Sequence, residues 1–129
     1  MTESKKPTAS NIKYLLTLLN LDTDGTGVRC VRLADALGIS KPSVHNMMNT
    51  FIESGYISKA SYGRAIFTAE GRKEAERYAR YFDAVSALLS DMIPQMSDLP
   101  AATYALLATL TDEELNSLAK TAHPHKTAS

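Results

Sequence analysis

A chain of 129 residues, of which 44% are hydrophobic and 22% charged, has the size and composition of one globular domain with a short extension. These values exclude a disordered or fibrous protein, and no stretch approaches the ~18 uninterrupted apolar residues of a membrane span. The formal net charge of zero argues against a protein that coats nucleic acid indiscriminately. Residues 1–10 lack the apolar run of a secretory signal, and a single cysteine excludes an internal disulfide, so we expect a cytoplasmic protein without a membrane partner.

The charges are divided unevenly along the chain. Residues 1–82 carry 12 Lys or Arg against 8 Asp or Glu, whereas residues 83–129 carry 2 against 6. The first part is therefore the candidate surface for a polyanion.

An amphipathic helix is predicted at residues 10–21, where Ile12, Leu15, Leu16 and Leu19 recur at helical spacing. The Gly-rich turn that follows, at residues 22–27, has the first acidic positions of a calcium loop. It lacks the third acidic position and the distant Glu ligand, so a solvated loop is the better interpretation.

Two helices separated by a short turn follow. The first is predicted at residues 30–37, and Gly38 stands where a helix end requires a positive φ. The second begins after Ser40 as N-cap, accepts Pro42 in its first turn and ends at Gly55. Two helices joined in this way form a helix-turn-helix. The residues expected to face the core are Val31, Leu33, Ala34, Leu37, Val44, Met48, Phe51 and Ile52.

Residues 56–60 and 65–68 alternate apolar and polar side chains around a turn, which predicts a β-hairpin, the wing. Thr68 can cap a long helix over residues 69–93, and two shorter helices are predicted at residues 100–110 and 111–120, before a frayed tail. The expected fold is mainly α, α+β in detail: a winged helix-turn-helix domain with a small β-hairpin wing and C-terminal dimerisation helices.

A helix that reads duplex DNA needs small polar residues at its start and apolar residues on its reverse. The polar set at the start of the second helix comprises Ser40, Lys41, Ser43, His45, Asn46 and Asn49. We expect Asn46 to bond an adenine edge and Pro42 to touch a thymine methyl, while Lys41, Ser43 and Asn49 are better placed for phosphates. Further donors for phosphate oxygens are Arg29, Arg32, Lys59, Tyr62 and Arg64. The alternative is a plain surface helix with solvated charges, on which His45 is simply an exposed histidine.

The stretch VRCVRLADALGISKPSVHNMMNTFIESGYISKASYGRAIFTAEGRKEA resembles the N-terminal winged-helix domain of the metal-dependent repressors related to the diphtheria toxin repressor and the manganese transport regulator. The likeness covers residues 12–89. It implies a homodimeric repressor that binds a palindromic operator in double-stranded DNA, with a DNA-binding domain at residues 1–82 and a helical dimerisation extension at residues 83–129.

The resemblance also implies an activating divalent metal, manganese or iron. The ligand positions of the family fall on Ser10, Lys13 and a site near Phe82, and none of these side chains serves as such a ligand. Residues 92–110 contain one acid, Asp98, and no histidine, while the H-x-H pair at residues 123–125 lies in the tail. We therefore expect no metal site, no other cofactor and a lost metal switch.

Three hypotheses about the function remain. The first is a DNA-binding transcription regulator that dimerises through apolar residues of the C-terminal helices, although the same residues can instead cover the core of the protomer. They are Val85, Leu88, Leu89, Met92, Leu106, Leu107, Leu110, Leu115 and Leu118. The others are a metal-responsive repressor with non-standard ligands and a winged-helix interaction module that does not bind DNA. We expect no enzyme, because no catalytic constellation is present and Cys30, expected as a buried thiol, has no nearby histidine.

Overall fold

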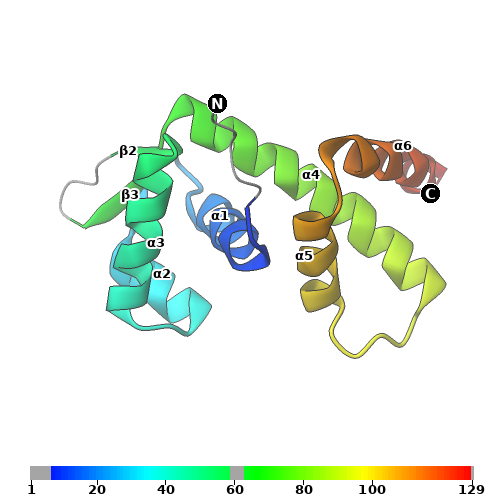
Figure 1. The fold of residues 1–129 in the computed structure, drawn as a ribbon, viewed down its shortest axis with the longest axis horizontal. Coiled ribbons are helices and arrows are strands. Elements are labelled where there is room, and N and C mark those ends of the chain that lie inside the picture. Colours follow the sequence, from blue (N-terminus) through cyan, green and yellow to red (C-terminus); the bar gives the residue numbers. More distant parts are fainter. Residues whose placement is uncertain (1–6, 59–62, 129) are drawn as a thin grey trace. The chain divides into compact units, whose positions relative to one another are not determined.

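The computed structural model of the chain describes residues 7–58 and 63–128, with side chains described up to residue 121. Six helices lie in this part: α1 (Ala9–Leu21), α2 (Cys30–Leu37), α3 (Lys41–Glu53), α4 (Ala69–Met92), α5 (Leu99–Thr109) and α6 (Asp112–Ala128). The same part contains three short strands, β1 (Val28–Arg29), β2 (Ile57–Ser58) and β3 (Arg64–Phe67) (Figure 1). No helix among the described residues is long and apolar enough to cross a membrane.

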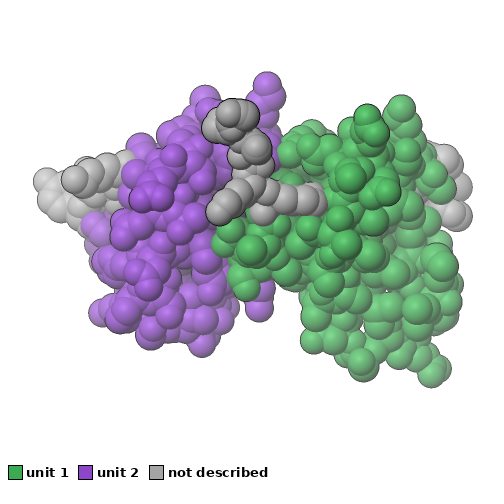
Figure 2. All heavy atoms as spheres, viewed as in Figure 1, with its two compact units in different colours: residues 1–12, 77–129 green, residues 13–76 purple. Residues whose placement is uncertain are grey.

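The chain forms two compact units (Figure 2). Lys13–Glu76 is one unit, and Met1–Ile12 with Arg77–Ser129 is the other. The first contains the helix-turn-helix and the sheet. The predicted boundary at residue 82 remains a prediction.

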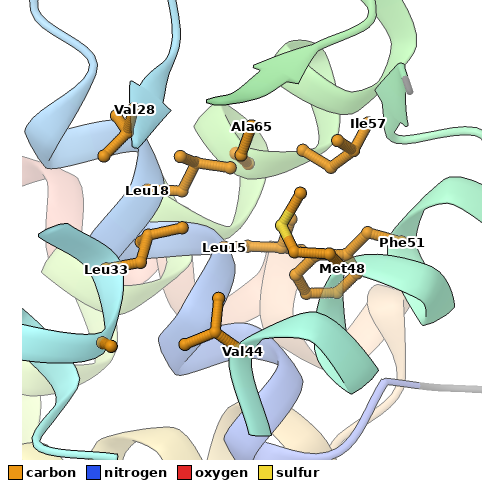
Figure 3. Close-up of a cluster of buried hydrophobic side chains, with 11 residues drawn as sticks. Leu15, Leu18, Val28, Leu33, Val44, Met48, Phe51, Ile57 and Ala65 are labelled. Carbon is orange, nitrogen blue, oxygen red and sulfur yellow. The ribbon is translucent and has the colours of Figure 1, made fainter. Parts of the chain in front are cut away.

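The core of the unit Lys13–Glu76 lies where α1, α2, α3 and the sheet meet. Figure 3 shows these side chains converging from the three helices and the strands. They include Leu15, Leu18, Val28, Leu33, Val44, Met48, Phe51, Ile57 and Ala65, each at most 6% exposed. The buried stripe predicted for α3 is confirmed at Val44, Met48 and Phe51, and Ile52 is half-buried.

One residue expected to face the core, Val31, is 43% exposed, so that prediction was wrong. Cys30 takes the place on the core side of α2, because it precedes Leu33, Ala34 and Leu37 by three, four and seven residues. It is half-buried, and this burial raises the pKa of its thiol. A neutral thiol that packs as a small apolar group follows from this placement.

The wing is a three-stranded antiparallel sheet with strand order β1-β3-β2. β3 has the predicted length but begins one residue earlier, and β2 covers residues 57–58 of the predicted 56–60, of which residues 59–60 lie outside the described residues. Strand β1 was not predicted from the sequence. A strand of two residues has no periodicity of its own and forms only by pairing with β3. In the register, Val28 lies opposite Ala65 and Arg29 opposite Arg64.

The start of α4 is fastened to the rest of the unit by the residues Thr68, Gly71 and Arg72. The Thr68 hydroxyl accepts from the Gly71 N–H at 2.9 Å, as the predicted N-cap, and donates to the Gly55 carbonyl at 2.6 Å. A Cβ on Gly71 would lie 2.6 Å from the carbonyl carbon of Tyr56, closer than real side chains come. Only glycine therefore permits this approach of α4 to the strand entry.

The predicted solvated loop at residues 22–27 is correct for Asp24 and its neighbours but wrong for Asp22. The Asp22 carboxylate accepts from the Gly27 N–H at 3.1 Å and forms an ion pair with Arg72 at 2.7 Å. Its side chain is 1% exposed. The first acidic residue of the supposed calcium loop is thus a structural group, paired with an arginine fifty residues further along the chain.

In the other unit, Arg77 joins α4 to α6. Its guanidinium lies over the rings of Tyr78 and Tyr81, 5.0 and 5.4 Å from their centroids, and bonds Asp112 at 3.2 Å. The Tyr81 hydroxyl donates to Asn116 at 2.9 Å. The capping box of α6 is present, since Thr111 and Glu114 exchange hydrogen bonds at 2.9 and 3.1 Å.

Helix α6 runs to Ala128, so the prediction that it ends at about Lys120 was wrong. A proline inside a helix removes one backbone donor and does not oblige the helix to end there. Helices α4 and α5 match their predicted spans within one residue.

Candidate nucleic-acid interface

Helix α3 presents its polar face outward and buries the opposite face. The residues predicted to contact DNA on it are all exposed; they are Ser40, Lys41, Pro42, Ser43, His45, Asn46 and Asn49. The helix begins as predicted, because the Ser40 hydroxyl accepts from the Ser43 N–H at 3.3 Å and donates to the Ser43 hydroxyl at 3.0 Å. Gly38, with φ of 68°, ends α2 in the left-handed conformation and completes the turn.

Four residues form the centre of the outward face, which we call the α3 stripe: Pro42, Asn46, Asn49 and Glu53. They follow one another at spacings of four, three and four residues, so at about 100° per residue they lie on one side of the helix. Among the described residues, neither asparagine amide has a hydrogen-bond partner, so both amides are available to a ligand. The sequence analysis did not identify Glu53 or Thr50 as part of this outward face. Their spacings of seven and four residues from Asn46 would have identified both.

Arginines meet at the base of the wing. Val28 and Ala65, which are cross-strand partners, are buried, so the neighbouring partners Arg29 and Arg64 share the opposite, outward side of the sheet. Like charges directly opposite each other destabilise a strand pair, and an anion between them would relieve that cost. Arg29 is exposed, whereas Arg64 is half-buried and donates to the Gly27 carbonyl at 3.1 Å.

A carboxylate lies near this pair. The Thr26 hydroxyl and N–H hydrogen bond to Asp24 at 2.8 and 3.1 Å, and these bonds, followed by a smaller contribution from Arg64, lower the pKa of the Asp24 carboxyl. Asp24 therefore remains ionised and offsets part of the charge of Arg64. The charge of Arg29 is therefore more available to a phosphate than that of Arg64.

Three further residues were predicted to contact phosphates: Arg32, Lys59 and Tyr62. Arg32 is exposed on α2. Lys59 and Tyr62 lie outside the described residues. The structure thus brings Arg29 and Arg64 together on one sheet face and gathers Pro42, Asn46 and Asn49 on α3.

The donor chemistry at the positions implied for a metal does not suit one. Lys13 is exposed and carries an ammonium group, and Phe82 packs against the Tyr104 ring with centroids 5.0 Å apart. Burial raises the pKa of the Tyr104 hydroxyl, which disfavours the phenolate form. Among the residues that the structure describes, no three His, Cys, Asp or Glu side chains group in a way that would hold an ion.

The comparison with protein families matches residues 13–61 to the IclR helix-turn-helix domain. This is less than half of the chain, and no curated protein sequence matches it.

Several solved structures share the fold. The manganese regulator SloR aligns with a TM-score of 0.75 at 17% identity, over 92% of this chain and 55% of that one. The IdeR protein of T. acidophilum gives 0.67 at 18% identity, over 94% and 55%. A hypothetical protein, SSo2273 from Sulfolobus solfataricus, gives 0.67 at 18% identity, over 89% and 88%. The chain spans about 55% of the length of the two regulators. At these identities the likeness is one of fold.

The expected winged helix-turn-helix fold is therefore confirmed, and the chain is of the winged helix-turn-helix class. Within that class, its helix-turn-helix matches the IclR type over residues 13–61. The resemblance to metal-dependent repressors agrees with the shared fold, and membership of that family remains a prediction.

Proposed function

We propose that this protein is a sequence-specific transcription repressor that binds a palindromic operator as a homodimer and does not require a metal activator. Two observations within the unit Lys13–Glu76 carry the proposal: the exposed Asn46 and Asn49 amides of α3, which have no partner among the described residues, and the arginine pair at the base of the wing. A helix with free amides supplies base contacts, and nearby cations supply phosphate contacts.

The proposed contacts divide into two groups. Asn46 and Pro42 face base edges in the major groove. Phosphate contacts come from Arg29, Arg32, Ser40, Lys41, Ser43, His45, Lys59, Tyr62 and Arg64. Because Arg64 is also bonded to the Gly27 carbonyl, replacing it disturbs the wing as well as any phosphate contact. Arg29 gives the cleaner test.

Dimerisation through the C-terminal helices is supported by large apolar side chains that remain exposed outside the core of the chain. Of the residues predicted for this role, Val85, Leu107 and Leu115 are buried within the chain. Met92, the last residue of α4, is 74% exposed, and Ile93, which follows it, is 49% exposed. Two-fold symmetry would place two α3 helices on the two halves of a palindrome. The repressor role rests on the sequence resemblance alone.

DNA binding is tested with duplexes selected from a random pool, measured by fluorescence anisotropy at several salt concentrations. Arg29→Gln should weaken binding to selected and unselected duplexes alike and lower the salt slope by ~0.9 for one lost phosphate contact. Lys73→Gln, at an exposed position of α4, is the matched control and should leave the slope unchanged. Failure of the wild-type protein to bind any duplex would refute the proposal.

The finer elements have their own measurements. Sedimentation equilibrium should give twice the protomer mass, and Met92→Lys should shift the mass toward one protomer. Affinity for the selected duplex should be the same with manganese, with iron and with a chelator. A large rise in affinity with either metal would show that metal independence is wrong while leaving DNA binding intact.

A further inference from the structure

The α3 stripe has a composition that restricts which bases it accepts. Its amide groups, those of Asn46 and Asn49, each offer a donor and an acceptor side by side. That pairing matches the N7 acceptor and N6 amino group that adenine presents in the major groove. Guanine presents two acceptors there, which suit Arg or Lys. The stripe contains neither of these residues.

Thr50 adds an apolar contact beside the stripe. Its hydroxyl donates to the Asn46 carbonyl at 3.2 Å, so the hydrogen is used within the helix and the methyl remains for a ligand. Together with the Pro42 ring this gives apolar groups on both sides of Asn46. Thymine is the base whose major-groove edge carries a methyl group.

The spacing of the two amides fits neighbouring base pairs. Asn46 and Asn49 are three residues apart, a rise of about 4.5 Å along the helix. Successive base pairs are separated by about 3.4 Å. Two bidentate contacts along one edge of the groove are therefore compatible with adjacent pairs.

Resting on the proposed DNA-binding function, we infer that α3 selects two neighbouring A·T pairs in each half-site, through Asn46 and Asn49, and makes no guanine-specific contact. Asn49, expected from the sequence at a phosphate, is assigned to a base because it lies within the α3 stripe beside Asn46. We expect Glu53 to mark the end of the part of α3 that contacts bases, because its carboxylate would be repelled by nearby phosphate oxygens.

The inference is tested by selecting duplexes from a random pool with the wild-type protein, Asn46→Ala, Asn49→Ala and the control Asn20→Ala, an exposed position on α1. Wild type and Asn20→Ala should enrich adenine at two neighbouring positions of each half-site. Asn46→Ala should lose the preference at one of them and Asn49→Ala at the other. Far-ultraviolet circular dichroism and the urea midpoint verify that each variant is folded.

Replacing each selected adenine by 7-deazaadenine removes the N7 acceptor and keeps the base pair. Affinity should fall at each position for the wild type, by less than the roughly 5- to 150-fold that corresponds to a whole bidentate contact, because the N6 amino group remains. The matching alanine variant should show no such fall. Guanine enrichment at these positions, or an Asn49→Ala variant that lowers the salt slope without changing base preference, overturns the inference. Absence of binding to any duplex would instead refute the proposed function.

Discussion

The buried ion pair between Asp22 and Arg72 provides a quantitative test of how the loop at residues 22–27 is held to α4. Arg72→Met leaves a carboxylate that is 1% exposed without its cation. Removing one partner of a buried pair costs about 3–5 kcal/mol, and because Arg72 itself is 36% exposed we expect about 3 kcal/mol. The contact of its guanidinium with the Phe67 ring, 5.3 Å from the centroid, contributes less, about 0.5–1 kcal/mol.

Asp22→Asn keeps an oxygen for the Gly27 N–H and loses the charge that binds Arg72. A hydrogen bond to a charged group contributes about 1.5–3 kcal/mol, so we expect a loss near 2 kcal/mol. In the double variant neither charge remains unpaired. The two single losses should therefore exceed the loss in the double variant by about 2 kcal/mol.

Urea unfolding followed by circular dichroism gives the four free energies of unfolding by linear extrapolation. Arg80→Met, at an exposed position of the same helix, is the control and should change the free energy by less than about 0.5 kcal/mol. A coupling energy below about 0.5 kcal/mol between Asp22 and Arg72 would refute the conclusion that this ion pair fastens the loop to α4.

Three further outcomes are expected. Gly71→Ala should destabilise the protein by about 1–3 kcal/mol in urea, because the added methyl overlaps the Tyr56 backbone; an unchanged midpoint would show that α4 can move away at no cost. Ser40→Ala should cost about 0.5–2 kcal/mol through loss of the bond from the Ser43 N–H, and Ser40→Asp should restore most of it. The Cys30 thiol should react with iodoacetamide more slowly at pH 8 than a free thiol, because burial raises its pKa and lowers the thiolate fraction, and urea should abolish the difference. The neutral thiol contributes its full stabilisation below the unfolded-state pKa, and this contribution falls as the pH rises through the folded-state pKa. Equal rates in folded and unfolded protein would contradict this.

The elements that could be predicted from the sequence are those specified by neighbouring residues. Helix α2 and the start of α3 match because Gly38, Ser40 and Pro42 act on the backbone within a few positions of themselves. The α3 core face was also predictable, since its period repeats within one helix. The Thr68 cap belongs to the same group.

The features that could not be predicted depend on residues far apart in the chain. Strand β1 exists through its partner β3, and the burial of Asp22 depends on Arg72. The exposure of Val31 follows from which side of a short helix meets the core, and eight residues give that period too few repeats. At the candidate site, the residue types were recognised, but the opposition of Arg29 and Arg64 required the register of the sheet.

The net charge of zero indicates little about DNA binding, because the charges differ in whether a protein group already satisfies them. Arg72 and Arg77 are held by carboxylates and aromatic rings within the protein. Arg29, Arg32 and Lys41 are exposed and have no carboxylate partner among the described residues. A phosphate gains most from cations that no other anion neutralises, because no existing ion pair must first be broken. These unpaired cations are therefore the ones that indicate the candidate surface for a polyanion. They lie on the same elements, β1 to α3, that present the free amides of Asn46 and Asn49.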